Sequence, residues 1–265
     1  MRITAADFLQ KYKQLFLAGA PGIAVFAYWK VKCLIETGEC FCLPDYDCWY
    51  MIRDRHLLVY YSPDNQMHIP AEDLNGLDCI SLPAAMYDSI KEQLTGFNVS
   101  YGWGLRYDFR YRPQEQDSQR YEAVDFDFAN PRHYRKAAAL INGGGKWLKA
   151  KNIRKMTTYT AFDPSLWFFV RDKATRELAA ISISAYDPEV RQTDLDFIFV
   201  APNFQGKGCG RFLIGETIRR CKDKSDSICV GGTVAFYRKC GFADYELWAW
   251  ASKEGYRFTA AGIQP

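Results

Sequence analysis

The chain has little net charge, few histidines and no extended apolar run. Its 34 lysines and arginines nearly balance 31 aspartates and glutamates, which gives a formal net charge of +3 over 265 residues. A dedicated nucleic-acid binder usually has a larger basic excess, with a pI above about 9, whereas the sequence pI here is about 8.3. We therefore expect no nucleic acid among its partners.

No segment of the sequence predicts a membrane-spanning helix. The longest uncharged stretch, residues 14–29, is interrupted by Gly19, Pro21 and Gly22, and it is shorter than the roughly 20 residues that a span requires. Asp7 lies where a signal peptide would have its apolar core. Nine scattered cysteines, an odd number, are typical of reduced thiols. We expect a cytoplasmic protein with no membrane attachment.

The cysteines and histidines do not predict a metal site either. Cys33, Cys40, Cys42 and Cys48 are close in the sequence, with His56 as the nearest histidine, but no paired C-x-x-C motif occurs. Buried thiols explain this cluster more simply than a zinc ion does. We therefore expect no metal cofactor.

Patterns for helices and strands alternate through the first 115 residues. Thr4 and Asp7 form a capping box at the start of a helix. Residues 23–29 and 57–61 predict short buried strands, 83–94 a helix, and 99–111 a long strand with apolar side chains at odd positions. We interpret 99–111 as an edge strand, open to pairing in a homodimer, and 1–115 as an N-terminal α/β domain.

The most polar segment, residues 113–119, predicts a linker to a second domain at 120–258. Beyond the linker the pattern predicts a strand at 121–126 and helices at 131–141 and 146–158. The pattern that follows gives strands at 166–171, 178–185 and 193–200, a helix at 208–222, a strand at 227–230, a short helix at 233–239 and a strand at 244–251. This order predicts an α/β fold with a mixed sheet.

A glycine-rich turn joins the strand at 193–200 to the helix at 208–222. Crowded glycines at such a turn leave backbone N–H groups directed outward, and together with the helix N-terminus they form a site for a phosphate or pyrophosphate. Lys207 and Arg211 add positive charge beside the turn. The turn therefore predicts a binding site for an anionic, diphosphate-like ligand.

Two short motifs make this interpretation more specific. Gln205, Gly208 and Gly210 fit the pattern [QR]-x-x-G-x-[GA], and about 25 residues later Phe236-Tyr237-Arg238-Lys239-Cys240-Gly241-Phe242 fits F-Y-x-K-x-G-F. With a strand between them, the two motifs resemble the signatures of the GNAT superfamily of N-acyltransferases. The resemblance extends over residues 121–258. It implies the GNAT acyl-CoA N-acyltransferase fold, with acetyl-CoA as the acyl donor.

The resemblance also implies a place for the cofactor, in a cleft where the strands at 193–200 and 227–230 separate. Backbone amides of the turn would hold the pyrophosphate, and main-chain groups of the strand would pair with the pantetheine arm and polarise the thioester carbonyl. The residues implied are Phe199, Val200, Gln205, Gly206, Lys207, Gly208, Cys209, Gly210 and Arg211.

Two catalytic residues follow from the same resemblance. Tyr237 would protonate the departing thiolate as a general acid, and Asp194 matches an acidic position that acts as general base in some members. A buried core tyrosine is the structural alternative for Tyr237, and Asp196 competes with Asp194 for the role of base. The sequence departs from the family at Val230 and Thr233, where Asn and Ala are common.

These features predict an N-acetyltransferase that moves an acetyl group from acetyl-CoA to a primary amine of a small molecule or peptide, by direct attack in a ternary complex. The order of helix, strands, helix and long strand in the first 115 residues is interpreted as a degenerate second GNAT-like copy. Because no Q-x-x-G-x-G turn occurs there, we expect no second CoA site. Two alternatives stay open. One is an aminoacyl-tRNA-dependent transferase of tandem GNAT-like type, and the other is a non-catalytic acyl-CoA-binding regulator.

Overall fold

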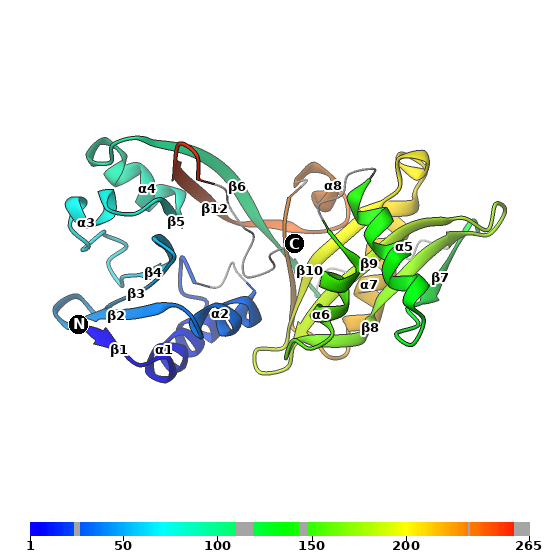
Figure 1. The fold of residues 1–265 in the computed structure, drawn as a ribbon, viewed down its shortest axis with the longest axis horizontal. Helices are drawn as coiled ribbons and strands as arrows, with labels where there is room; N and C mark the ends of the chain where they lie inside the picture. Colours follow the sequence, from blue (N-terminus) through cyan, green and yellow to red (C-terminus); the bar gives the residue numbers. More distant parts are fainter. Residues whose placement is uncertain (24–26, 110–118, 144–147, 233, 257–265) are drawn as a thin grey trace. The chain divides into compact units, whose positions relative to one another are not determined.

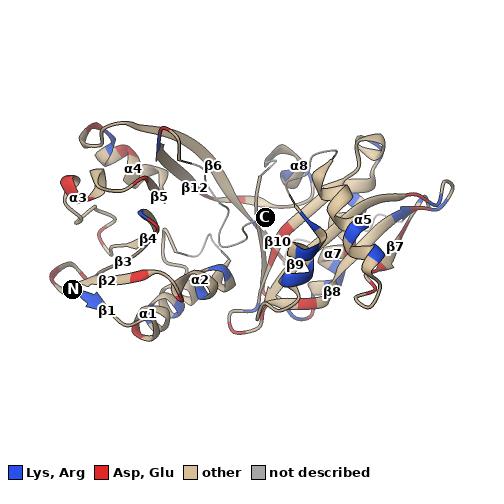
Figure 2. Cartoon of the chain, in the orientation of Figure 1, with Lys and Arg blue, Asp and Glu red and all other residues tan. Residues whose placement is uncertain are grey.

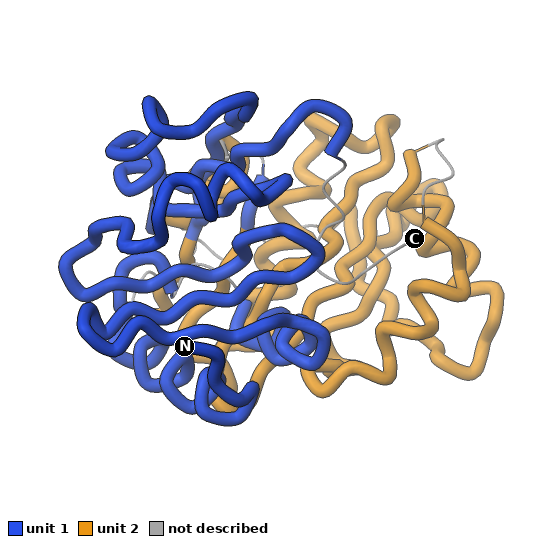
Figure 3. Tube along the Cα trace, turned by 60° about the vertical axis from the view of Figure 1, so that its left-hand side comes forward, with its two compact units in different colours: residues 1–105, 231–234, 244–262 blue, residues 106–230, 235–243, 263–265 orange. Residues whose placement is uncertain are grey.

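The computed structural model describes residues 1–23, 27–109, 119–143, 148–232 and 234–256, so most of the expected linker at 113–119 lies outside the described residues. The chain divides into two compact units (Figure 3). Unit 1 comprises residues 1–105, 231–234 and 244–262, and unit 2 comprises residues 106–230, 235–243 and 263–265. Each unit has a buried core of its own.

The first half of the chain begins with a strand and two helices and ends with a long strand (Figure 1). Its elements, in order, are β1 (Arg2–Ile3), α1 (Ala5–Leu17), α2 (Tyr28–Ile35), β2 (Glu39–Leu43), β3 (Cys48–Arg53), β4 (His56–Tyr61), α3 (Ala71–Asn75), β5 (Cys79–Pro83), α4 (Ala84–Ile90) and β6 (Phe97–Asp108). Two single 3-10 turns, η1 (Pro44–Tyr46) and η2 (Lys91–Gln93), complete it.

The second half repeats this order element by element. It consists of β7 (Tyr121–Asp125), α5 (Pro131–Asn142), α6 (Ala150–Met156), β8 (Phe162–Asp172), β9 (Leu178–Asp187), β10 (Gln192–Val200), η3 (Pro202–Phe204), α7 (Cys209–Cys221), β11 (Ser227–Gly231), α8 (Val234–Arg238) and β12 (Ala243–Lys253). In both halves the first four strands pair antiparallel in sequence order, and the fifth pairs parallel to the fourth. The chain therefore contains the same mixed α/β topology twice.

β12, the last strand of the second half, lies almost wholly in unit 1, and the end of β6, the last strand of the first half, lies in unit 2. β12 pairs antiparallel with β5, from Trp248 opposite Pro83 to Ser252 opposite Cys79, and its Ala249 and Ala251 belong to the buried core around β5 and α4. The end of β6 lies beside β11 in unit 2, where Tyr107 is buried against Phe242. The compact units therefore differ from the contiguous expected domains, because β12 completes the sheet of unit 1.

This exchange corrects the interpretation of β6 as an edge strand. β12 and β11 are its neighbours in the sheet order, and the strands at the ends of that order are β1 and β7. The long alternating pattern of β6 does not therefore expose an unpaired edge. The expectation that β6 pairs with a second copy of the chain in a homodimer therefore has no support from this sheet order.

Local sequence predicted α1, β4, α4 and β6 of the first half, gave no prediction for β1, β2, β3, α3 and β5, and made one clear error. The capping box is confirmed, since Thr4 Oγ1 accepts a hydrogen bond from the Asp7 backbone N–H at 3.1 Å. The strand expected at 23–29 is wrong where it is described, because Tyr28 and Trp29 begin helix α2. The rings of Tyr28 and Trp29 would be buried in a strand as well as in a helix. Their apolar character alone therefore did not distinguish a strand from a helix. No helix among the described residues is long and apolar enough to cross a bilayer.

Candidate active site

The glycine-rich turn has the backbone geometry of an anion site. Gly206 and Gly208 have φ angles of 72° and 84°, in the left-handed region, and Gly208 is the N-cap of α7. A Cβ atom at either position would meet nothing within 4 Å. Glycine is therefore favoured at these two positions by backbone conformation and not by lack of space.

The turn ends where the first intrahelical hydrogen bonds of α7 begin. The Phe212 N–H donates to the Gly208 carbonyl oxygen at 3.1 Å. The N–H groups that precede it belong to the first turn of the helix, which has no intrahelical acceptors and carries the positive end of the helix dipole. Lys207 and Arg211 are exposed beside it. The structure thus brings amides and two cations together, as the sequence predicted for a pyrophosphate.

Gly210 has a different role from the two glycines before it. A Cβ atom on Gly210 would lie 3.0 Å from Cζ of Phe236 and 3.5 Å from Cγ2 of Val200. Absence of a side chain therefore lets the start of α7 pack closely against α8 and the end of β10. The two sequence motifs, one holding Gly210 and the other Phe236, meet at this contact.

Cys209 is fully buried in the core beneath the turn. Burial raises the pKa of its thiol to about 12, and the nearby Arg120 guanidinium opposes this only in part. The thiol is therefore neutral at physiological pH and unreactive. Only the backbone of Cys209 is suited to contact a ligand.

Two side chains hold the turn in place. Gln205 donates from Nε2 to the carbonyl oxygen of Val200 at 3.1 Å, which closes the loop on itself. Tyr121, on the distant strand β7, donates from its hydroxyl to the Lys207 carbonyl oxygen at 3.1 Å. Tyr121 was not predicted as a site residue. Because 86 residues separate Tyr121 from Lys207, no local sequence pattern indicates this hydrogen bond.

The expected cleft begins where β10 and β11 stop pairing. Their parallel register comprises three pairs, from Gln192 opposite Ser227 to Asp194 opposite Cys229. β10 continues to Val200 in register with β9 on its other side. Phe199 and Val200 therefore lie on the part of β10 beyond its pairing with β11, as expected for residues that face a pantetheine arm.

A β-bulge in β10 separates the two candidate bases. Between Asp194 and Phe197 the register with β9 advances by three residues on β10 but by two on β9. The extra residue interrupts the alternation of side chains. A regular strand would place Asp194 and Asp196, two residues apart, on the same side, and the bulge removes this relationship. Asp194 is 6% exposed, whereas Asp196 is half-buried.

Tyr237 and Asp194 lie near each other in unit 2. The Tyr237 side chain, on α8, is 7% exposed and packs edge-on against Phe236 and Phe242. Burial is the main cause that raises its pKa, and the charges of Cys240 and Asp194 raise it further. The phenol is therefore kept protonated, which is the state that a general acid needs before it acts.

The departure at Val230 has a structural counterpart. Val230 is buried near the end of β11, so an apolar side chain fills the position where the GNAT resemblance led us to expect Asn. Thr233 lies outside the described residues. Among the residues that the structure describes, no group of three His, Cys, Asp or Glu side chains is arranged to hold a metal ion.

Comparison with known proteins identifies the class of protein. The family model described as acetyltransferase (GNAT) domain matches residues 164–244. A GCN5-related N-acetyltransferase from Sphaerobacter thermophilus superposes with a TM-score of 0.69 at 14% identity, over 100% of this chain and 95% of that one. A GNAT-family acetyltransferase from Colwellia psychrerythraea gives 0.65 at 12% identity, over 96% and 99%. No curated protein sequence matches the chain.

A tandem GNAT protein from the clavulanic acid biosynthesis pathway superposes with a TM-score of 0.60 at 13% identity, over 97% of this chain and 99% of that one. The fold is thus that of GNAT acetyltransferases along the whole chain. More particularly, residues 164–244 in the second half of this chain are similar to the GNAT acetyltransferase domain family. Members of that family generally use acetyl-CoA or another acyl-CoA and act on amines.

Proposed function

We propose that unit 2 transfers an acetyl group from acetyl-CoA to a primary amine of a small molecule or peptide. The observation that carries the proposal is the turn of Gly206 and Gly208, with its left-handed backbone, at the N-terminus of α7 beside the end of β10. The pattern suits a diphosphate-bearing donor, because a helix N-terminus and successive amides favour a pyrophosphate.

Binding of the donor follows from the turn and the cleft together. The amides from Gly206 to Arg211 are assigned to the pyrophosphate, with Lys207 and Arg211 contributing positive charge. The backbone of Phe199 and Val200 is assigned to the pantetheine arm. Gln205 then acts by holding the turn, since its amide donates to Val200 within the protein.

The chemical step is a direct attack by the amine on the thioester. An amine with a pKa near 10.4 requires roughly 4 to 5 kcal/mol to lose its proton at pH 7, and Asp194 is assigned to accept that proton, directly or through a water. The amine nitrogen forms a bond to the acetyl carbonyl carbon, while an amide of β10 stabilises the negative oxygen. The carbon–sulfur bond then breaks, Tyr237 donates its proton to the leaving thiolate, and the acylated nitrogen returns its excess proton to the Tyr237 phenolate to give the neutral amide.

The first half of the chain is assigned the role of a second copy without a CoA site. Its loop after β4, residues 62–70, contains no glycine, so it lacks the turn that suits a pyrophosphate. We retain residues 1–115 and 120–258 as the two copies in chain order, with β12 of the second copy and the end of β6 of the first copy packed in the other unit. We also retain a cytoplasmic location as part of the proposal.

Thermal unfolding with acetyl-CoA, free CoA and 3′-dephospho-CoA tests the donor. A ligand at about a hundred times its Kd adds roughly 2.7 kcal/mol of stability, which amounts to a shift of several degrees for a chain of this size. We expect a shift with acetyl-CoA. Release of free thiol in the presence of an amine panel then separates an enzyme from a non-catalytic binder.

The alternatives predict different outcomes of the same experiment. An aminoacyl-tRNA-dependent transferase would gain no stability from any of the three CoA ligands, and this result would overturn the proposal. A regulator would gain stability from acetyl-CoA but would release no thiol with any amine. The turn favours acetyl-CoA over the first alternative, because a diphosphate is the group that it is built to hold.

A further inference from the structure

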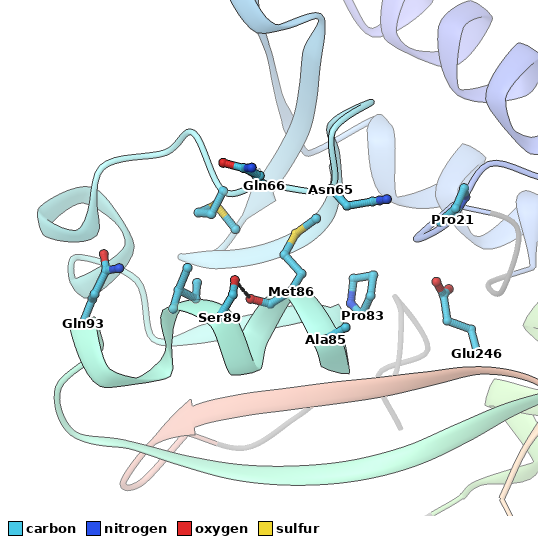
Figure 4. A pocket seen from close by; sticks show the side chains of 11 residues that line it. Pro21, Asn65, Gln66, Pro83, Ala85, Met86, Ser89, Gln93 and Glu246 are labelled. Carbon is cyan, nitrogen blue, oxygen red and sulfur yellow. Dashed lines mark hydrogen bonds between the residues drawn. The ribbon is translucent and has the colours of Figure 1, made fainter.

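Unit 1 contains a cavity of about 570 Å3 that the proposed reaction in unit 2 does not use (Figure 4). This volume lies within the range of small-molecule sites, about 300 to 1,000 Å3. It is bounded by the loop after β4, the end of β5, helix α4 and one residue of β12. The residues that matter for its chemistry are Met67, Pro83, Met86, Ile90 and Glu246.

The cavity occupies the same topological place as the proposed cofactor cleft of unit 2. It lies beside the loop that follows the fourth strand of its half and the end of the fifth strand, and the following helix forms one wall. β4 and β5 pair in parallel only from His56 to Leu57 before the pairing ends. This matches the separation of β10 and β11, so the cavity is the counterpart of that cleft.

Its surroundings do not suit a CoA-type ligand. α3, which replaces the long helix α7, has five residues and carries Glu72 and Asp73 in its first turn (Figure 2). Asp64, on the loop after β4, accepts hydrogen bonds from Ser62 and His68. No lysine or arginine occurs among the described residues that line the cavity. Acids instead of cations therefore stand where a pyrophosphate would bind.

Glu246 gives the cavity a single charged group. Its carboxylate oxygens accept hydrogen bonds from the Gly22 N–H at 2.9 Å and from Trp248 Nε1 at 3.1 Å, and both donors are neutral. Among the described residues it forms no salt bridge with a lysine or arginine. In Figure 4 the carboxylate points into the space between Pro21 and Pro83. Burial raises the pKa of this carboxyl, and the two hydrogen bonds oppose that rise.

The rest of the wall is mostly apolar and flexible. Met67, Met86, Pro83 and Ile90 line it, together with neutral polar residues, namely Asn65, Gln66, Ser89 and Gln93. Methionine adapts to ligands of different shape because its side chain has three rotatable bonds and a polarisable sulfur. A cavity with a largely apolar wall, a few neutral polar groups and one carboxylate fits a ligand that has an apolar body and one cationic end, because a desolvated carboxylate is stabilised by a charge-assisted hydrogen bond.

We propose that this cavity in unit 1 binds a small primary ammonium compound with an apolar body, its ammonium group on Glu246 and its body against Met67, Met86 and Pro83. The site is separate from the proposed acetyl transfer in unit 2 and does not depend on it.

Isothermal titration calorimetry with n-hexylamine at pH 7, with n-hexanol as the uncharged analogue, tests the proposal. We expect Glu246→Gln to weaken n-hexylamine binding by about tenfold or more and to leave n-hexanol binding unchanged. Glu254→Gln removes an exposed acid of the same unit and should leave both unchanged. A wild-type protein that does not bind n-hexylamine would overturn the proposal.

Further variants distinguish binding in this cavity from binding elsewhere on the protein. Ala85 lines the cavity but is exposed on α4, so Ala85→Trp should fill the cavity without disturbing the core and abolish binding of both probes. Asp194→Asn, in unit 2, should leave n-hexylamine affinity unchanged. The proposal is wrong if affinity depends on Asp194 instead of Glu246, or if Ala85→Trp binds n-hexylamine normally. Circular dichroism confirms that each variant is folded.

Discussion

Asp194 and Cys229 are the last register pair between β10 and β11, and the Cys229 thiol donates to Asp194 Oδ1 at 3.5 Å. The carboxylate thus sits at the point where parallel pairing ends and the proposed cleft begins. Its charge also acts on Tyr237, whose pKa it helps to raise. The Asp194 carboxylate therefore acts on Tyr237, the other proposed catalytic group, from the end of the β10–β11 pairing.

Asp194→Asn should lower kcat by about 100-fold or more, in the range typical of a lost general base, while the Kd for acetyl-CoA stays unchanged. The amide cannot accept the amine proton but keeps the size of the side chain. Steady-state kinetics with a responsive amine measures the effect. Asp196→Asn, within the bulge, is the matched control. Equal losses in both variants would show that neither residue alone is the base.

Tyr237→Phe should lower kcat by about 100-fold to 10,000-fold with little change in acetyl-CoA affinity. The ring remains to pack against Phe236 and Phe242, so stability should change little. Thiol release and calorimetry measure the two quantities separately. Unchanged turnover would mean that another group, or water, protonates the thiolate.

Gly208→Ala should weaken acetyl-CoA binding and destabilise the fold by about 1 kcal/mol, because a left-handed backbone is unfavourable for a residue with a Cβ atom. Gly215→Ala is a control within the same helix. A Cβ atom there has open space, and alanine in a helix interior should stabilise by about 0.5 to 1 kcal/mol. Chemical denaturation and calorimetry should therefore give opposite signs for stability, with a loss of affinity only in Gly208→Ala.

Tyr121→Phe should raise the KM for acetyl-CoA several-fold, because the hydroxyl that anchors the Lys207 carbonyl is lost. A single hydrogen bond contributes about 1 kcal/mol to stability. Tyr186→Phe removes a similar bond, to the Lys224 carbonyl oxygen at 2.8 Å, away from the turn. We expect similar losses of stability from both variants and a change in KM from Tyr121→Phe alone. A matching KM change in Tyr186→Phe would contradict the anchoring role.

The interactions of Asp172 predict that the folded protein becomes less stable in acid. The Arg120 Nε–H donates to its carboxylate at 2.6 Å, the Thr175 and Ala174 amides also donate to it, and these bonds lower its pKa. A carboxyl whose pKa is lowered in the folded state stabilises the fold at pH values above its pKa in the unfolded chain, about 3.9. This contribution is lost as the pH falls below that value towards the folded-state pKa.

The wild-type chain should therefore be more stable than Asp172→Asn at pH 7, and the difference should narrow between pH 4 and pH 2. Urea denaturation across this range measures it. Asp223→Asn, at an exposed position, should differ little from the wild type at any pH. A difference between wild type and Asp172→Asn that is constant with pH would contradict the assignment.

Much of the site could be predicted because its signals are local. The left-handed turn at Gly206 and Gly208, the close approach at Gly210 and the tyrosine of the second motif each depend on a few neighbouring residues. Strand and helix periods identified β10, α7 and β11 for the same reason. The bulge in β10 was missed, because one extra residue leaves no mark on the pattern of apolar positions.

The sequence by itself determined the helix and strand order of the second half, the glycine-rich turn at the start of α7 and the family that the turn resembles. Only the tertiary structure decided that β12 joins β5 in unit 1, that Tyr121 supports Lys207, and that Glu246 points into the cavity of unit 1. Each of these pairs residues that are far apart in the chain. The strand that β12 pairs with depends on which pairing buries more apolar surface. The local spacing of apolar residues in the sequence does not encode that pairing.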